Sequence, residues 1–356
     1  MRRVVAAPAA RVAAHRSGGG TGGARAGGAT AGNGPVRHFE LLNLATGDKY
    51  DAPNVGFPVL EGLAWLAIKM NGSQEGASHR GTDLLLRRLS DGTTQNVGNV
   101  AQYDFDDAGK VVAYTVDAAD QLGNGVFVLD LASGTTRALD TDRKTYDSLS
   151  WRADSTDLVA LRGEQPDGKT QRENVLLAWT GAGSANPSPI VWDPSTDNSF
   201  PSGFVLSEFS APRWSEDGSR LFVGIKEQED KPEESSEPKA NLDIYHWKDV
   251  DLQSEQIVRI AQLRRATYAS ALSIPSKTFV RLADDAIDVT TTADAPRSVD
   301  PTPYQHDPPE GDPSRADYYR IDTSTGQSDC SSRSTCSARW ARRPTAAGSC
   351  SSRTCT

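Results

Sequence analysis

Histidine and cysteine are the residue types whose spacing most often reveals a catalytic or metal site. The histidines of this sequence show no i, i+4 pairing of the kind that two metal ligands on one helix require. His246 stands beside Trp247, where we expect it to pack or to form a hydrogen bond. We therefore predict no ligand role for the five histidines, which are His15, His38, His79, His246 and His306.

The four cysteines all lie near the C-terminus, at Cys330, Cys336, Cys350 and Cys355. A disulfide or zinc module is one interpretation. However, the spacings are not paired C-x-x-C units, no histidine accompanies them, and almost no apolar residue surrounds them. The Ser/Arg/Cys/Thr composition favours disorder, or a GC-rich gene translated in the wrong frame, over a metal site. The redox compartment therefore does not follow from the cysteines.

Grouped carboxylates occur at residues 104–107 and 284–285. A calcium loop ends in a bidentate Glu, which the run 104–109 lacks, and a glycosidase needs two carboxylates placed across a cleft. We expect these groups to mark turns. Gly123 and Gly125 lie between short strands rather than before a helix, which predicts a turn and not a dinucleotide site. The sequence thus predicts no catalytic, cofactor-binding or metal-binding residue, and no cofactor.

The elements that would position any site are short strands joined by glycine turns. An alternating run, a turn with Asp, Ser or Thr before Gly, and a second short run recur along the chain. Gly is expected in these turns because a type I turn followed by a bulge needs a positive φ, which costs Gly little. The glycines of the four predicted hairpins are Gly47, Gly92, Gly134 and Gly326.

A second element alternates with these hairpins. It has an aromatic start, a turn with Asp and Gly or Ser, and a β-rich run, and it occupies residues 103–114, 149–161 and 212–225. Gly92 follows Gly47 by 45 residues, and Gly134 follows Gly92 by 42. Periods in the forties built from short strands are typical of β-propeller blades. A two-sheet sandwich is the alternative, but the constant spacing favours a propeller.

The repeats predict an all-β chain, with an incomplete β-propeller of about five to six four-stranded blades at residues 36–327. Residues 1–35 are rich in Arg, Ala and Gly and lack the apolar run of an export signal, which predicts a disordered head. Residues 328–356 are predicted to be a disordered Ser/Arg/Cys-rich tail. Because an open ring leaves strand edges unpaired, we expect marginal stability for the chain alone.

The charge and hydropathy of the chain limit its partners. The net charge of −9 argues against broad binding to the nucleic-acid backbone. No run approaches the roughly 18 apolar residues of a spanning helix, so we expect no membrane span. The acidic run at 227–237 is expected to be a solvated surface loop rather than a cation-binding arm. The cellular compartment does not follow from the sequence.

Taken together, these elements resemble the propeller domain of prolyl-oligopeptidase-family serine peptidases, in particular the bacterial dipeptidyl- and acylaminoacyl-peptidase branch. The resemblance covers about residues 38–327. The turn motifs are common to many propellers. The segment His246-Trp-Lys-Asp249, followed by Gln253 or Gln256, points to this branch, and the hairpin at 316–326 also looks like one of its late blades.

The resemblance implies that catalysis takes place in a separate α/β-hydrolase domain, with a Ser-Asp-His triad and its Ser in a Gly-x-Ser-x-Gly elbow. That spacing does not occur here, and the roughly 200 residues of such a domain do not follow Gln327. We therefore expect a non-catalytic chain, inactive alone, that controls the access of short peptides to an active site absent from it. The alternative is a non-enzymatic TolB- or WD-like propeller that serves as a protein-binding scaffold.

Overall fold

The computed structural model describes residues 3–4, 12–14, 38–43, 46–53, 59–61, 64–71, 79–231, 253–284, 288–290, 297–300, 316–334 and 352–353. The chain divides into two compact units. Unit 1 comprises Met1–Ala160 and Trp179–Ser188, and unit 2 comprises Leu161–Ala178 and Pro189–Thr356. Among the described residues, no helix has the length and apolar character needed to cross a membrane.

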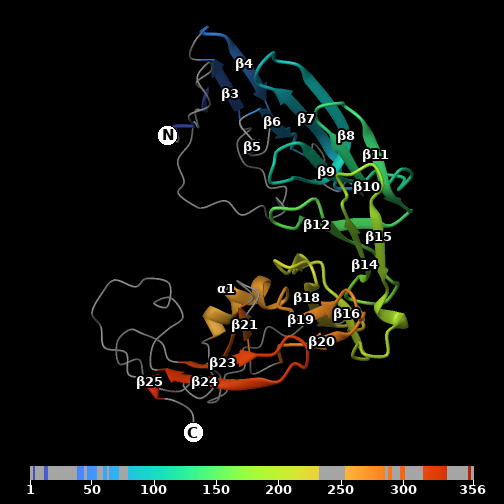
Figure 1. Ribbon diagram of the computed structural model, residues 1–356, viewed down its shortest axis with the longest axis vertical. Coiled ribbons are helices and arrows are strands. Elements are labelled where there is room, and N and C mark those ends of the chain that lie inside the picture. Colours follow the sequence, from blue (N-terminus) through green and yellow to red (C-terminus); the bar gives the residue numbers. More distant parts are fainter. Residues whose placement is uncertain are drawn as a thin grey trace, which may run out of the picture. The chain divides into compact units, whose positions relative to one another are not determined.

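Unit 1 is built from strands that pair with their neighbours along the chain (Figure 1). Its first sheet has the order β1-β2-β3-β4, and its second has the order β11-β10-β9-β8-β7-β6-β5. The pairing is antiparallel throughout both sheets, which is the up-and-down arrangement of propeller blades. The strands are β1 Arg3–Val4, β2 Val12–Ala14, β3 His38–Asn43, β4 Lys49–Pro53, β5 Val59–Glu61, β6 Trp65–Lys69, β7 Thr82–Arg88, β8 Thr94–Phe105, β9 Val111–Val116, β10 Gly125–Asp130 and β11 Thr136–Thr141.

The long strand β8 explains why the second sheet has seven strands. Its first part, up to Val100, pairs with β7, and its last part, from Val100 onward, pairs with β9. Near Val100 the register shifts, and Asn99 has a φ of 56°. The sheet therefore consists of two four-stranded repeats, β5–β8 and β8–β11, which share β8.

The remaining sheets continue the same pattern. The third sheet has the order β12-β13-β14-β15, and the division between the two units falls within it. Unit 2 also contains a sheet of order β16-β18-β19-β20, with β17 paired to β18, and a sheet of order β21-β22-β23-β24-β25. The all-β fold that the sequence predicts is confirmed. The strands are β12 Thr145–Trp151, β13 Leu158–Glu164, β14 Glu173–Thr180, β15 Ser188–Trp192, β16 Phe204–Leu206, β17 Arg213–Trp214, β18 Arg220–Glu227, β19 Tyr268–Ser273, β20 Phe279–Arg281, β21 Asp288–Thr290, β22 Arg297–Asp300, β23 Ala316–Ile321, β24 Ser328–Ser334 and β25 Ser352–Arg353.

The four glycines predicted to form hairpin turns all adopt a positive φ, of 79° at Gly47, 75° at Gly92, 69° at Gly134 and 74° at Gly326. In each turn the glycine N–H donates to the carbonyl oxygen four residues earlier, at 2.8 or 3.0 Å. A side-chain oxygen closes the same turn from within. In the third hairpin, for example, Asp130 Oδ1 accepts from Ser133 N at 2.8 Å. The predicted turn chemistry is confirmed.

The second predicted element also forms the turns that the sequence requires. Gly109 and Gly218 have φ values of 63° and 71°. The copy at 149–161 has no glycine, and there Asp154 takes the left-handed conformation with a φ of 51°. In the first copy, Asp106 Oδ1 accepts from Lys110 N at 2.7 Å and from Val111 N at 2.8 Å. The carboxylate of Asp106 therefore stabilises a turn, as predicted.

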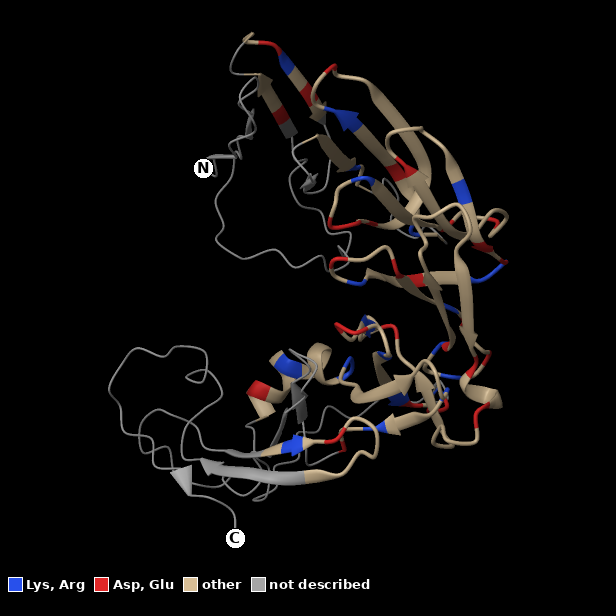
Figure 2. Ribbon diagram, in the orientation of Figure 1, with Lys and Arg blue, Asp and Glu red and all other residues tan. Residues whose placement is uncertain are grey.

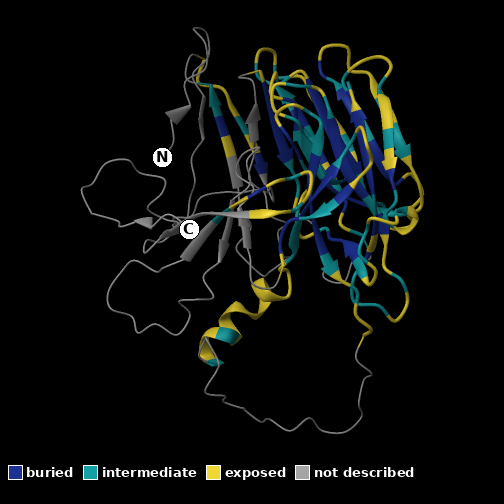
Figure 3. Cartoon of the chain, turned by 60° about the horizontal axis from the view of Figure 1, so that its bottom comes forward, coloured by how far each residue is buried: buried dark blue, intermediate teal, exposed yellow. Residues whose placement is uncertain are grey.

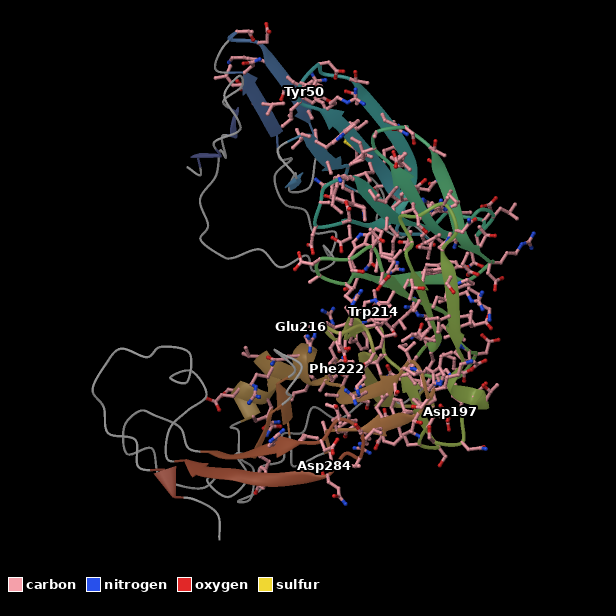
Figure 4. All side chains as sticks on the ribbon, in the orientation of Figure 1. Tyr50, Asp197, Trp214, Glu216, Phe222 and Asp284 are labelled. Atoms are coloured by element: carbon pink, nitrogen blue, oxygen red, sulfur yellow. The ribbon has the colours of Figure 1, made fainter. Side chains whose placement is uncertain are left out.

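Each unit has its own buried core. In unit 1 the inward side chains of β6 to β10 form one cluster, and Tyr114 and Phe127 stack with their ring centroids 5.5 Å apart. In unit 2, Phe222 packs with Ala271, Leu282, Ala283 and Ile321. Figure 4 labels Trp214 on β17 and Phe222 on β18, two buried aromatic residues of the same sheet. Strands β6, β9, β10 and β18 are buried at consecutive positions, so both of their faces are covered, whereas β11 alternates between exposed and partly buried residues.

Unit 2 contains one feature that the sequence analysis does not predict, the helix α1 at Gln253–Leu263. Ile257, Ile260 and Leu263 recur every three residues, but eleven residues are too few for this periodicity to stand out among alternating strands. The segment His246-Trp-Lys-Asp249 lies outside the described residues, as do Cys336, Cys350 and Cys355. Strand β24 pairs with β23 and continues the last hairpin past residue 327, where the predicted tail begins.

Candidate functional site

Arg80 in unit 1 forms ion pairs with two aspartates, Asp117 and Asp147. Arg80 lies in the connection between β6 and β7, Asp117 directly follows β9, and Asp147 lies inside β12. These three residues therefore come from three successive repeats. We call this group the Arg80 clamp.

The guanidinium of Arg80 binds both carboxylates. Its Nη2 donates to Oδ2 of Asp147 at 3.0 Å, and its Nη1 lies at ion-pair distance, 3.0 Å, from Oδ1 of the same carboxylate. Its Nε lies 3.4 Å from Asp117 Oδ2, and the backbone N–H of Arg80 donates to the same oxygen at 3.0 Å. The side chains of Asp117 and Asp147 are only 9% and 6% exposed, whereas that of Arg80 is 54% exposed. Two buried carboxylates are thus paired with one half-exposed cation.

The pKa values of the two basic groups in and beside the clamp, Arg80 and Lys69, are shifted in opposite directions. Burial works to lower the pKa of Arg80, but the negative charges of Asp147 and then Asp117 outweigh it, and the pKa is raised. The pKa of Lys69, at the end of β6, is lowered by burial and then by the positive charge of Arg80. Lys69 Nζ donates to the carbonyl oxygen of Ala101. Two cations therefore stand near two carboxylates, which balances the formal charge.

Hydrogen bonds fix the connection between β9 and β10 next to the Arg80 clamp. Asn124, which is buried, donates from Nδ2 to the carbonyl oxygen of Lys144 at 3.0 Å and accepts at Oδ1 from Ala118 N at 2.8 Å. Gly81 N donates to the carbonyl oxygen of Asp117 at 3.2 Å. A Cβ at Gly81 would lie 2.2 Å from that same oxygen, so only glycine permits this approach.

Strands β8 and β12 of unit 1, and the turns that follow them, are joined by hydrogen bonds between residues that lie 47 positions apart in the sequence. Leu149 N donates to Gln102 Oε1 at 3.2 Å, and Trp151 Nε1 donates to the carbonyl oxygen of Asp104 at 3.1 Å. Asp154 N donates to Asp107 Oδ2 at 2.6 Å. The constant offset shows that β8 and β12 begin successive repeats in the same register, which agrees with the period expected from the sequence.

In unit 2, the connections between the second and third strands of successive repeats are joined by different contacts. The connection between β13 and β14 meets the end of β18, where Thr170 N donates to the carbonyl oxygen of Glu229 and Lys231 N donates to that of Gly168, both at 2.8 Å. Gln171 N donates to Gln228 Oε1 at 2.9 Å, and Gln228 Nε2 donates to the carbonyl oxygen of Gln171 at 3.0 Å. We call this group the unit 2 clasp; it consists of residues 168–171 and 228–231.

The clamp can hold loops in place. Three N–H groups of Arg80, on its backbone N, Nε and Nη2, donate to the carboxylates of Asp117 and Asp147. His79 is the one histidine whose side chain lies among the described residues, and its Nδ1 is buried without a hydrogen-bond partner. Within the described ranges, no group of three or more His, Cys, Asp or Glu could hold a metal ion.

The residues considered as candidates from the sequence are not brought together. Asp104, Asp106 and Asp107 each serve turns or the β8–β12 contact, and Gly123, with a φ of 84°, forms the turn before β10. Asp284 ends the described part of its segment, and Asp285 lies outside it. The sequence analysis missed the Arg80 clamp. The available signal was Asp147, a charge in the middle of the strand-like run 145–151, where a paired and buried carboxylate is the expected explanation.

Comparisons with known proteins add a likeness of fold. No family model and no curated protein match the sequence. Solved structures that are similar include the β-propeller domain of the Trilobed protease from Pyrococcus furiosus, with a TM-score of 0.39 and 9% identity over 84% of this chain and 77% of that one. Pyrococcus horikoshii acylaminoacyl peptidase is similar with a TM-score of 0.38 and 12% identity, over 78% of this chain and 38% of that one. Porphyromonas gingivalis dipeptidyl peptidase 4 is similar with a TM-score of 0.46 and 10% identity, over 84% of this chain and 44% of that one.

The chain thus spans less than half the length of the latter two peptidases. TolB from Acinetobacter baumannii is also similar, with a TM-score of 0.33 and 10% identity over 82% of this chain and 58% of that one. Such low identities and TM-scores carry nothing about activity.

Proposed function

We propose that the chain is the non-catalytic propeller portion of a prolyl-oligopeptidase-family serine peptidase. In this role it would limit the size of the peptides that reach an α/β-hydrolase active site. The observation that carries the proposal is the alternation of glycine hairpins and aromatic-Asp turns, because these are the motifs on which the sequence resemblance rests. All six glycines singled out in these motifs have a φ between 63° and 79°. The segment His246-Trp-Lys-Asp249 directs the proposal to the dipeptidyl- and acylaminoacyl-peptidase branch.

The proposed gating role fits the way the repeats are held. In unit 1 the Arg80 clamp and the three contacts between β8 and β12 join successive repeats through buried or backbone groups. A filter that excludes folded proteins must keep its loops in place, and buried, paired charges favour one arrangement over others. Short peptides are the proposed substrates of the assembled enzyme.

The first test is the DNA that follows the coding segment. We expect a reading frame, in this or another phase, that encodes Gly-x-Ser-x-Gly followed by Asp and His. The protein that includes this frame should react with a fluorophosphonate probe and cleave a short chromogenic peptide but not a folded protein, while the present chain should not react. Stoichiometric labelling of the present chain, or an unrelated downstream sequence, would contradict the proposal.

A second candidate function, a non-enzymatic propeller that serves as a protein-binding scaffold, is favoured by Leu122. This leucine is 55% exposed in a connection that Asp120 and Asn124 hold in place. In a scaffold, this single leucine would be one anchor point for a partner protein. The same downstream sequence distinguishes the two candidates, because a scaffold requires no hydrolase frame.

A further inference from the structure

Helix α1 of unit 2 gathers most of the exposed large apolar side chains that the structure describes. Ile257, Val258, Ile260 and Leu263 are 64%, 83%, 45% and 48% exposed, and none of the eleven residues of the helix is buried. Figure 3 shows α1 as an exposed coil that projects away from the buried strands. Outside α1, the described exposed large apolar residues are Leu122, Val191 and Phe209, which lie singly.

This helix lacks the usual source of helical stability. An isolated helix shorter than about 12 to 15 residues is marginal in water, and most helices in proteins are stabilised by packing of their apolar face. Because α1 buries no residue, a surface that covers Ile257, Val258 and Leu263 would stabilise it. Exposed apolar residues that cluster in this way mark interaction sites.

The charged residues around α1 indicate the charge of the surface that would cover it. Arg259, Arg264 and Arg265 lie in or directly after the helix, and Glu255 is the one acidic residue between 253 and 266. Lys226 adds a fourth basic group, since its Nζ donates to the carbonyl oxygen of Ala266 at 3.2 Å. Figure 2 shows blue and red segments on α1. This basic end belongs to a chain with a net charge of −9, so it fits a surface that is both apolar and anionic.

A second copy of the chain fits this description poorly. Pairing two α1 helices would bring three arginines near three others, and helices of about 16 Å bury far less than the roughly 1,200 Å² of a stable interface. A phospholipid layer offers anionic headgroups above an apolar boundary, the combination that basic amphipathic helices bind. We infer that α1, with Arg259, Arg264 and Arg265, docks this protein in the plane of an anionic phospholipid surface. The inference is independent of the proposed peptidase function.

The test is co-sedimentation of the full chain with vesicles of 70% phosphatidylcholine and 30% phosphatidylserine, and with vesicles of phosphatidylcholine alone. We expect binding to the first and at least about tenfold weaker binding to the second, with a decrease as salt is raised. The variant I257S/V258S removes the apolar contact, and the variant R264E/R265E reverses two charges. Each should weaken binding to the anionic vesicles by at least about tenfold.

Matched controls are Val191→Ser, another exposed apolar residue of unit 2, and Arg143→Glu, an exposed arginine of unit 1; both should bind as the parent chain does. Equal loss in a control, or no binding by the parent chain, would overturn the inference. Poly-glutamate that binds as tightly as the anionic vesicles would assign the patch to an acidic protein instead. Sedimentation velocity that shows a dimer abolished by I257S/V258S would assign it to a second copy.

Discussion

The Arg80 clamp and the unit 2 clasp occur at the same place in the repeat, but buried ion pairs dominate the first and backbone hydrogen bonds dominate the second. In both, the connection between the second and third strands of one repeat meets the corresponding connection of the next. Unit 1 joins them mainly through the ion pairs of Arg80 with Asp117 and with Asp147 of the following repeat, together with one backbone bond from Gly81 N to the carbonyl oxygen of Asp117. Unit 2 joins them mainly through backbone groups, with the side chain of Gln228 bonded to the backbone of Gln171.

The difference determines how each junction fails. Side-chain ion pairs disappear with one substitution and leave a buried charge without its partner, which is strongly unfavourable. Backbone hydrogen bonds are independent of residue type, so a substitution in the clasp removes only part of the contact. The junction in unit 1 should therefore be specific and sensitive to mutation, and the one in unit 2 should be tolerant.

The largest effect should come from Gly81→Ala in the clamp. The added Cβ would lie 2.2 Å from the carbonyl oxygen of Asp117 and 2.5 Å from that of Asn99, and neither backbone atom can move freely. We expect a loss of about 3 kcal/mol in the free energy of unfolding, measured by urea denaturation. The matched variant Gly168→Ala in the clasp meets no atom within 4 Å and should lose about 1 kcal/mol through its φ of 72°. Equal losses would remove the contrast between the junctions.

Arg80→Met should have the next largest effect. It leaves Asp117 and Asp147 buried without the cation of Arg80, and we expect the free energy of unfolding to fall by about 2 kcal/mol. This value is below that of a fully buried pair because the arginine side chain is 54% exposed and partly screened by solvent. Arg143→Met, at an exposed position, is the control and should leave the urea midpoint unchanged.

The triple variant R80M/D117N/D147N sharpens this result. If the loss arises from unpaired carboxylates, removing their charge should restore most of the stability. If the loss arises from missing packing of the arginine side chain, the triple variant should be no better than R80M.

Gln228→Ala in the clasp should cost about 1 kcal/mol, because one donor and one acceptor are lost while the bond from Thr170 N to Glu229 remains. Gln228→Glu keeps an acceptor for Gln171 N, so its free energy of unfolding should lie between those of the parent chain and of Gln228→Ala. A loss as large as that of R80M would show that the backbone bonds of the clasp do not hold without the glutamines.

A smaller, pH-dependent effect is expected at the turn of residues 215–219 in unit 2. Hydrogen bonds from Ser215 and then Ser219 lower the pKa of Asp217 to about 2 from the ordinary 3.8. Because the folded pKa lies below the unfolded one, this contribution to stability is complete above about pH 4 and is lost as the pH falls through 2. Carboxyl NMR titration should give a pKa near 2, and Ser215→Ala should raise it. An unchanged pKa in that variant would assign the shift to Ser219 alone.

Lys169→Ala should have the smallest effect, with no measurable change in the urea midpoint. Lys169 Nζ lies 2.8 Å from Asp230 Oδ1, but these side chains are 41% and 83% exposed, and exposed pairs are screened by solvent. If removing this pair destabilises the protein as much as removing Arg80, exposure does not account for the difference between the junctions.

The local turn chemistry could be predicted from the sequence because each turn is determined within about six residues. A glycine preceded by Asp, Ser or Thr between two alternating runs leaves few backbone alternatives, and Gly47, Gly92, Gly134 and Gly326 all adopt the expected φ. The Arg80 clamp could not be predicted in this way. Arg80 lies 37 residues from Asp117 and 67 from Asp147, so their contact depends on the registers of several strands.

The sequence by itself determined where the chain turns and roughly how far apart the repeats lie, because glycine requirements and turn chemistry are local; it did not predict strand β24 at Ser328–Ser334. Tertiary structure alone decided which charges meet, which of two equivalent junctions contains buried ion pairs, and that residues 253–263 form an exposed helix. These outcomes depend on burial, and burial follows from the packing of distant strands rather than from the identity of neighbouring residues.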